Sequence, residues 1–390
     1  MSRFLWVVPP LAGHVNPAAG IADELVARGH EVAWSGTETM LRPLLGPEAR
    51  IFGTGNRAFR AMGGHGLASL RSLWEGFVVP YAKFTLKPLD AVVREFRPDA
   101  LLVDQHTPAG ALVAHRHGLP WASLAPGALE LGRPYRALPQ VEGWMTGLLE
   151  GLWQRAALPA AEFTDPRFSP HLVVATTGRP LLGDLPEAPH HALVGPVLTE
   201  RPADPAFPWE RLDPDRRTVL VTMGTMSDAV GADFLHRTVR ALAEDGEGVQ
   251  AVIAAHRGAV PAALPDNVLV VERAPVLELL AKGAVDAVLC HGGMNTVVES
   301  LAHGVPLLIA PIRNDQPFVA QRVAEAGAGL RVPFARVTPA VIAERLRQLL
   351  GDASHRTAAE LIGRQLLAGG GAVTAADRME ALVTGSPPAA

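Results

Sequence analysis

A histidine and an aspartate lie where they could carry group-transfer chemistry. His14 lies in PLAGHVNP, between a short apolar run and a helix-like segment, and Asp104 ends the apolar run LLVD. An exposed histidine near its ordinary pKa is a suitable general base, and a carboxylate on its other ring nitrogen would orient it. Each residue type is more often structural when taken alone. We predict that together they form a catalytic pair, whereas other histidines such as His106 have less distinctive surroundings.

A second motif, HGGMNTVVE, follows an apolar run in the C-terminal half. Gly292 and Gly293 carry no side chain that would cover the free backbone N–H groups of a helix start, where the helix dipole also favours an anion. His291, Asn295 and Thr296 would add donors. The motif predicts a diphosphate site that requires no metal, since it lacks a metal-binding carboxylate pair. The alternative is an ordinary glycine-rich turn between a strand and a helix.

The segment RNDQP places Asp315 and Gln316 after the next apolar run. Acidic and amide side chains at adjacent positions can accept from and donate to the hydroxyls of a sugar. The alternative is a helix cap followed by Pro317 in the first turn. Because this segment and the glycine motif both follow successive strands, we expect them at one edge of a parallel sheet.

Aromatic and apolar side chains in the N-terminal half suggest a hydrophobic partner molecule. They lie on segments 74–84 and 143–158, near a glycine cluster at 63–66. We predict that Trp74, Phe77, Trp144 and Met145 chiefly form the site of a bulky, largely hydrophobic molecule whose hydroxyl is the acceptor of the transferred group. The alternative is that these residues pack the core of their own domain.

The elements that must position these groups are alternating apolar runs and helix-like segments, which is typical of parallel α/β architecture. The expected strands are residues 4–8, 31–35, 100–103, 121–124, 172–175, 218–221, 250–254, 268–271, 285–290 and 307–310. Helices are expected over 15–28, 108–117, 233–244, 294–303 and 317–326, with mobile loops and helices between 53 and 87. Five prolines between 196 and 214 indicate a linker. We therefore predict two Rossmann-like domains, residues 1–200 and residues 218–390, joined by a linker over residues 201–217. The two domains are expected to face each other across a cleft, and the last helix is a candidate to return to the first domain.

The composition of the chain indicates more than one domain and excludes several kinds of binding partner and location. The 390 residues exceed what one hydrophobic core usually supports, and 48% of them are apolar. The net charge is −4 and only three residues are lysine, so we expect no nucleic-acid partner. Cys290 is the only cysteine, which excludes an internal disulfide and fits a reducing cytoplasm. The N-terminal apolar run is too short for a signal peptide, and no segment reaches membrane-spanning length.

The sequence resembles the family 1 glycosyltransferases, which have the GT-B fold. The stretch from APVLELL through HGGMNTVVES to RNDQPFVAQRV is similar to their donor-binding signature, and PLAGHVNP is similar to their acceptor-side base motif. Bacterial members acting on macrolides, other polyketides and carotenoids are closer than plant members. The resemblance implies a nucleotide diphosphate sugar as donor, Gly224 and Thr225 in the first loop of the nucleotide domain, Glu299 on the ribose, and Asp315 with Gln316 on the transferred sugar. Arg273 stands where plant members carry a base-stacking tryptophan, which leaves UDP- and TDP-sugars both open.

We therefore predict an inverting transfer of sugar to a hydroxyl of a hydrophobic natural product, by a monomer or homodimer, without cofactor or metal. A sugar-nucleotide epimerase or a lipid-linked sugar transferase is the alternative within the fold, and a catalytically silent sugar-nucleotide-binding subunit is the alternative outside enzymes. No GxGxxG follows the first apolar run and no GxxxxGK[ST] occurs, which disfavours a dehydrogenase and a Walker-type nucleotidase.

Overall fold

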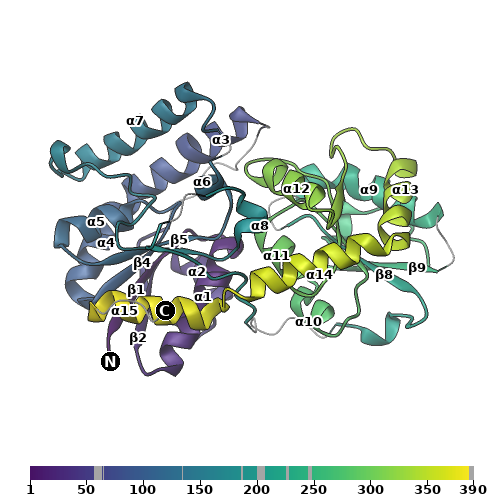
Figure 1. Ribbon diagram of the computed structural model, residues 1–390, viewed down its shortest axis with the longest axis horizontal. Helices are drawn as coiled ribbons and strands as arrows, with labels where there is room; N and C mark the ends of the chain where they lie inside the picture. Colours follow the sequence, from purple (N-terminus) through teal and green to yellow (C-terminus); the bar gives the residue numbers. More distant parts are fainter. Residues whose placement is uncertain are drawn as a thin grey trace. The chain divides into compact units, whose positions relative to one another are not determined.

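The computed structural model describes residues 1–56, 64, 66–133, 135–185, 188–199, 207–224, 228–244 and 248–385. The chain divides into two compact units (Figure 1). The first comprises Met1–Pro202 together with Ala368–Ala390, and the second comprises Ala203–Leu367. Of the expected linker, residues 201–206 lie outside the described part, and Trp209–Arg211 form a short 3₁₀ helix.

The first unit is built on a parallel sheet of seven strands in the order β3-β2-β1-β4-β5-β6-β7, counted over the described residues. The strands are β1 (Arg3–Val7), β2 (Glu31–Gly36), β3 (Ile51–Gly53), β4 (Ala100–Asp104), β5 (Trp121–Ala125), β6 (Leu172–Ala175) and β7 (His191–Leu193). Side chains alternate between the two faces of a strand. Phe4 and Trp6 of β1 accordingly pack in one core, and Leu5 and Val7 pack in the core on the opposite face. Burial on both faces explains the nearly continuous apolar character of these strands.

Helices cover both faces of this sheet. They are α1 (Ala12–Ala27), α2 (Glu38–Leu45), α3 (Leu67–Leu73), the π-helix η1 (Trp74–Val78), α4 (Val79–Phe96), α5 (Ala109–His117), α6 (Leu129–Gly132), α7 (Pro139–Arg155), α8 (Arg179–Leu182) and α15 (Gly371–Thr384). From β1 the chain adds β2 and β3 on one side of the sheet and then β4 to β7 on the other side. The switch lies between β1 and β4, which are hydrogen-bonded neighbours. In parallel sheets, such a switch point forms a crevice at the carboxyl ends of the two strands.

The second unit repeats this plan on a parallel sheet in the order β10-β9-β8-β11-β12-β13. Its strands are β8 (Arg217–Thr222), β9 (Val249–Ala254), β10 (Val268–Val271), β11 (Ala287–Cys290), β12 (Leu307–Ile309) and β13 (Gly329–Arg331). Its helices are α9 (Asp228–Glu244), α10 (Val276–Ala281), α11 (Met294–Ala302), α12 (Gln316–Glu325), α13 (Pro339–Gly351) and α14 (Ala353–Leu367). Here β8 and β11 are the neighbours at the switch point.

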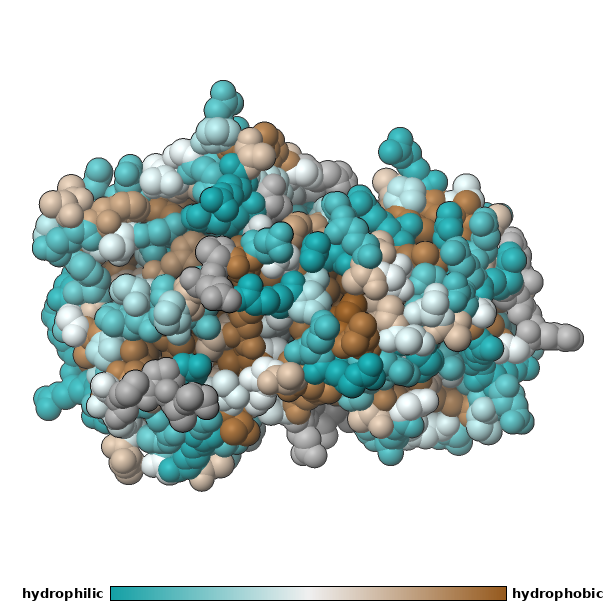
Figure 2. Space-filling view, viewed as in Figure 1, coloured by the Kyte–Doolittle hydropathy of each residue, from teal (hydrophilic) through white to brown (hydrophobic). Residues whose placement is uncertain are grey.

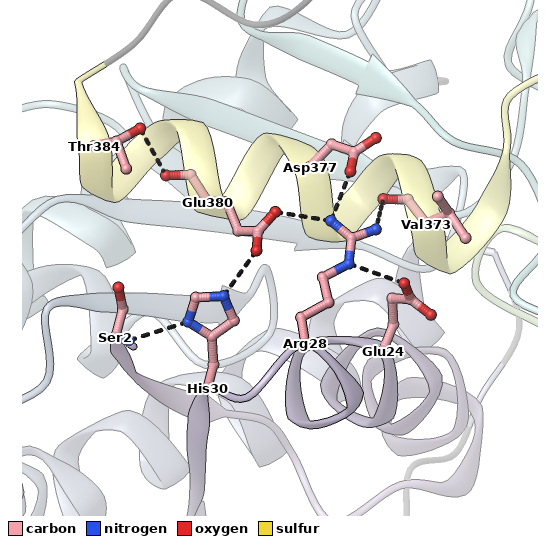
Figure 3. Close-up of polar contacts among 8 residues, drawn as sticks. All are labelled: Ser2, Glu24, Arg28, His30, Val373, Asp377, Glu380 and Thr384. Carbon is pink, nitrogen blue, oxygen red and sulfur yellow. Dashed lines mark hydrogen bonds and ion pairs between the residues drawn. The ribbon is translucent and has the colours of Figure 1, made fainter.

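The C-terminal helix α15 packs on α1 in the first unit. Ala375, Ala376 and Met379 are fully buried in the core that also contains the apolar face of α1. Polar contacts flank this apolar seam (Figure 3): Arg28 donates to Asp377 (2.6 Å) and Glu380 (2.7 Å). The other carboxylate oxygen of Glu380 lies 2.8 Å from Nε2 of His30, and Nδ1 of His30 accepts a hydrogen bond from the backbone N–H of Ser2. The last helix is therefore an integral part of the first unit.

The observed elements differ from the expectation in one helix start, in the length of one helix and in three short strands that were not expected. Helix α1 begins at Ala12, before Asn16 and Pro17, because the backbone N–H of Val15 already donates to the carbonyl of Leu11. The segment 53–87 contains the long helix α4, which continues through Pro88 although proline usually interrupts helices. The short strands β3, β7 and β13, of three residues each, gave no recognisable pattern.

The surface is mixed in character. On the face shown in Figure 2, hydrophilic residues predominate and hydrophobic residues appear between them. Large apolar side chains that are exposed, such as Leu67, Leu138 and Val373, come from different elements. Among the described residues, the helices are too short or too polar to cross a membrane.

Candidate active site

The two switch points carry the residues that the sequence singled out. In the first unit, His14 lies in the first turn of α1, directly after β1, and Asp104 is the last residue of β4. In the second unit, Gly224 follows β8 and His291 follows β11. Because β8 and β11 pair through Thr222 and Cys290, Gly224 and His291 emerge side by side at one sheet edge. Each unit thus presents polar groups at the place where open parallel sheets bind ligands.

The structure brings His14 and Asp104 into direct contact. Nδ1 of His14 lies 2.8 Å from Oδ2 of Asp104, whose side chain is fully buried, while 18% of the His14 side chain is exposed. A carboxylate only accepts hydrogen bonds, so Nδ1 carries the hydrogen and Nε2 keeps its lone pair. The backbone N–H of His106 donates to Oδ1 of Asp104 at 2.8 Å, and thereby fixes the carboxylate. The pair presents an oriented imidazole with a free basic nitrogen.

A third ionisable group lies beside this pair and was not predicted from the sequence. The ring centroid of His106 is 4.8 Å from that of His14, and the two planes are inclined by 43°. The available signal was its position two residues after Asp104, at the end of the same strand. His14, Asp104 and His106 also place one ligand atom each within 4.8 Å of one another, a grouping that metal ions use.

In the second unit, two glycines form a narrow cradle for the ring of His291. A Cβ atom added to Gly224 would lie 2.8 Å from Cε1 of His291, and one added to Gly293 would lie 2.7 Å from Nε2. Both distances are shorter than real Cβ contacts allow. Gly224 also has a φ of +73°, which favours glycine. The two glycines are therefore required by the position of the histidine ring itself.

His291 is held in its neutral form. Burial lowers its pKa to about 4, a hydrogen bond to the backbone of Thr222 opposes that shift, and the nearby positive charge of Arg313 adds to it. Its Nδ1 atom is buried and has no hydrogen-bond partner among the residues that the structure describes. A buried polar atom without a partner is costly unless a ligand satisfies it. The histidine is therefore suited to donate or accept a hydrogen bond with a bound group.

Helix α11 begins immediately after this cradle, with Gly293 as its N-cap. Asn295 and Thr296 lie in its first turn, where backbone N–H groups have no partner within a helix. Gly292, with a φ of +88°, packs tightly before this turn, since a Cβ at this position would lie 2.9 Å from Cγ2 of Ile309. The arrangement matches the general form of an anion site at a helix N-terminus.

The loop before α12 is shaped by the side chain of Gln316. Its Oε1 atom accepts hydrogen bonds from the backbone N–H groups of Ile312 and Arg313, each at 2.9 Å. The oxygen of the amide is therefore committed to the loop, and the NH₂ group remains for a ligand. Asp315 is the N-cap of α12, and Asn314 before it has the positive φ of 54°. Both predicted sugar-binding residues lie at the carboxyl end of the strand next to β11.

The remaining predicted donor residues differ in their surroundings. Glu299 is 4% exposed on α11, and Arg273 lies on the surface after β10. Thr225 lies outside the described residues.

The four predicted acceptor residues separate into two groups. Trp74, Phe77 and Met145 are at most 4% exposed and belong to the core of the first unit, so little of their surface is available to a ligand. Trp144 is half-buried and lines a cavity of about 380 Å³. The cavity lies between α3 with η1 on one side and α7 on the other, and its lining is Leu67, Leu70, Arg71, Glu75, Gln140, Val141 and Trp144.

The cavity combines apolar walls with one polar cluster. The indole N–H of Trp144 donates to Oε1 of Glu75 at 3.0 Å, and Arg71 pairs with the other oxygen at 2.8 Å. The hydrogen bonds from Arg71 and from Trp144 lower the pKa of Glu75. An amphipathic molecule would find both apolar contact and hydrogen-bonding groups here.

Comparison with known proteins gives a consistent result. Residues 236–382 match the family described as Erythromycin biosynthesis protein CIII-like, C-terminal domain. The chain is 28% identical to 4'-demethylrebeccamycin synthase of Lentzea aerocolonigenes, over 98% of this chain and all of that protein. It is also 28% identical to a zeaxanthin glucosyltransferase of Pseudescherichia vulneris, over 99% of both chains.

A solved structure is similar over nearly the same extent. The spinosyn rhamnosyltransferase SpnG, complexed with thymidine diphosphate, is 25% identical, has a TM-score of 0.76, and is matched over 94% of this chain and 96% of its own. This similarity extends over both parallel-sheet α/β units of the chain.

Proposed function

This chain is a glycosyltransferase of the GT-B fold and a homologue of natural-product glycosyltransferases, and from that premise we propose its reaction. The enzyme transfers a sugar from a nucleotide diphosphate sugar, TDP- or UDP-linked, to a hydroxyl group of a hydrophobic natural product in the cytoplasm. The anomeric configuration is inverted. His14 is the general base and Asp104 orients it.

The observation that carries this proposal is the contact between Nδ1 of His14 and Oδ2 of Asp104. It leaves Nε2 as a base on the partly exposed side of the residue. A protein that only binds a sugar nucleotide has no use for a base oriented in this way. The contact therefore favours an enzyme over a silent binding subunit.

The proposed chemistry is a single displacement. Nε2 of His14 removes the proton of the acceptor hydroxyl while the acceptor oxygen forms a bond to the anomeric carbon. The bond between that carbon and the diphosphate oxygen breaks, and its electron pair leaves with the diphosphate. Asp104 stabilises the imidazolium that forms. Because no carboxylate nucleophile takes part, one displacement yields inversion: an α-linked D-sugar donor gives a β-glycoside.

The second unit binds the donor in this proposal. The first turn of α11, with Gly293, Asn295 and Thr296, receives the diphosphate, and His291 uses its unsatisfied Nδ1 atom there. These groups stabilise the developing negative charge without a metal ion. Glu299 binds the ribose, and Gly224 and Thr225 bind the nucleotide.

Three further residues bind the transferred sugar and the nucleotide base. Asp315 and the NH₂ group of Gln316 bind hydroxyls of the transferred sugar. Arg273 stacks its guanidinium on the nucleotide base, where a planar cation can replace an aromatic ring. Thymine and uracil both offer such a face. The complex of the rhamnosyltransferase with thymidine diphosphate supports a TDP-sugar.

The acceptor is a largely hydrophobic aglycone. The cavity beside Trp144 offers apolar walls together with Glu75 and Arg71. The named relatives act on zeaxanthin and on a spinosyn, which supports an aglycone of this kind. Trp144 is the predicted acceptor residue that the proposal retains, because Trp74, Phe77 and Met145 are committed to the core.

The proposal is tested with a panel of UDP- and TDP-sugars against hydroxylated polyketides, macrolide aglycones and carotenoids, with products detected by mass. We expect a product heavier than the aglycone by one sugar residue, with an inverted anomeric centre in its NMR spectrum. An epimerase would convert the sugar nucleotide without an acceptor, and a lipid-linked sugar transferase would require a polyprenyl phosphate acceptor. A binding subunit would give no product with any pair.

A further inference from the structure

A buried chain of ionisable groups leads to His106, whose ring packs against that of His14. Nε2 of His106 lies 3.4 Å from Oε1 of Glu130, and the other oxygen of Glu130 accepts from Nη1 of Arg167 at 2.9 Å. Asp165 pairs with the same guanidinium at 2.7 Å. Glu130 and Arg167 are each 3% exposed. Burial of two charges is costly, so such a pair persists only with close and complete partners.

Several contacts hold this chain rigidly in the first unit. The guanidinium carbon of Arg167 lies 5.6 Å from the ring centroid of Trp74 and 5.5 Å from that of Phe168. The side chain of Gln105 donates to the carbonyl of Arg167 at 3.2 Å. The loop that carries Arg167 is therefore tied to the loop that carries His106. Burial alone would raise the pKa of Glu130, but His106 and the charge of Arg167 outweigh it and lower the pKa, so the carboxylate is ionised.

We propose that His106, anchored by Glu130, is a positioning residue that holds the imidazole of His14 against Asp104. This inference rests on the proposed function, in which His14 is the base. Two contacts restrain the ring of His14: the hydrogen bond at Nδ1 and the ring of His106, whose centroid is 4.8 Å away. A hydrogen bond alone permits rotation of the imidazole about its axis, whereas a packed neighbouring ring restricts it. Proton removal depends on that orientation.

Three described groups lie against His106. Its backbone N–H donates to Asp104, its ring packs on that of His14, and its Nε2 atom lies at an ion-pair distance of 3.4 Å from Oε1 of Glu130. Arg167 lies behind Glu130 and balances that carboxylate. Because Glu130 is ionised, its charge favours a hydrogen on the nearby Nε2 atom of His106 and attracts that side chain. The position of the His14 ring is thus linked to a carboxylate that does not touch it.

The test compares four variants of the full chain labelled with ¹⁵N-histidine. His106→Ala removes the packed ring, His106→Gln keeps a nitrogen donor toward Glu130, and Glu130→Gln removes the anchoring charge while Arg167 keeps Asp165. His115→Ala is the matched control, because His115 forms a similar pair with Glu162 at 2.9 Å on the surface of the same unit. The signal of His14 is assigned with His14→Ala, and both its Nδ1–H resonance and its titration midpoint are recorded.

We expect His106→Ala to lose the protected Nδ1–H signal of His14 or to displace its titration midpoint by at least about 0.5 unit, as an altered neighbour within 5 Å would. The turnover of His106→Ala should fall about 10-fold or more. His106→Gln should recover most of the His14 signal and most of the turnover. Glu130→Gln should lie between His106→Ala and the wild type in both measurements. An unchanged His14 signal in His106→Ala and Glu130→Gln, equal to that of His115→Ala, would overturn the inference. If instead His14→Ala itself retains full turnover, the proposed function fails, and the two failures are therefore distinguishable.

Discussion

A methyl group on Gly293 would lie 2.7 Å from Nε2 of His291, so the glycine and the imidazole occupy one packing site. The backbone at Gly293 has a negative φ, which alanine adopts readily. Substitution by alanine therefore acts through the histidine ring and not through backbone strain. The Gly293→Ala variant therefore tests the packing of the histidine ring, without the backbone strain that a substitution causes at a glycine of positive φ.

We predict that Gly293→Ala weakens donor binding by about 10-fold or more, since the ring of His291 must move and a diphosphate contact is lost. Calorimetric titration with TDP and UDP measures this effect. Gly258→Ala is the control, because a Cβ at that position of the same unit meets nothing within 4 Å. Equal affinities in the two variants would show that the cradle does not serve the donor.

The low pKa of His291 predicts a loss of stability in acid. In the folded chain this histidine stays neutral down to about pH 4, while in the unfolded chain it binds a proton near pH 6.5. The unfolded state therefore takes up more protons between these values, so stability is present above pH 6.5 and falls as the pH drops toward 4.

The contribution is at most about 3 kcal/mol. Thermal unfolding of the wild type and of His291→Asn from pH 7 to pH 4 checks it. The wild type should lose more stability than the variant over this interval. Parallel pH profiles would mean that His291 titrates as an ordinary histidine.

Trp144 should determine the affinity for the acceptor. We predict that Trp144→Ala raises the acceptor KM about 10-fold, because the largest wall of the cavity is removed, and leaves the donor KM unchanged. Initial rates with each substrate varied in turn measure both constants. Trp209→Ala, a partly exposed tryptophan of the second unit, is the matched control and should change neither. A larger effect of Trp144→Ala on the donor KM would place the aglycone elsewhere.

Catalysis should survive removal of divalent cations. In the proposed mechanism, the helix start of α11 and His291 stabilise the leaving diphosphate, so we expect EDTA to leave more than about half of the activity. His14, Asp104 and His106 together have the spacing of a metal site. The same assay with added Zn²⁺ tests this site, and we expect inhibition because a bound zinc ion would occupy the catalytic base. Complete loss on chelation, reversed by a divalent cation, would contradict this part of the account.

Periodicity revealed most of the fold because the buried parallel strands are continuous apolar runs. β6 and β10 match their predicted bounds, and β1, which precedes His14, and β4, which ends at Asp104, were placed within one residue. The contact between His14 and Asp104 was predicted because a carboxylate at the end of a strand could orient the imidazole. Short strands such as β3 were missed because three residues define no alternation.

Side-chain neighbours from distant segments were beyond the same reasoning. Glu130 and Arg167 are 37 residues apart and meet only because helix α6 folds against the loop that carries Arg167, so nothing local marked them as a pair. Similarly, Trp74 and Trp144 were equivalent in the sequence, since an apolar helix face looks the same against a core and against a cavity. Only packing shows that the first is buried and the second lines the cavity.

The most direct test of the account is the turnover of His14→Ala with the donor and aglycone pair identified in the screen. Loss of a positioned base should lower kcat by about 10²–10⁴-fold, while the affinity for TDP or UDP stays within about 2-fold of the wild type, since the donor site is built from the second unit. Asp104→Asn should lose less, because the base remains. Near-wild-type turnover of His14→Ala, with His115→Ala as the control, would contradict the claim that His14 activates the acceptor.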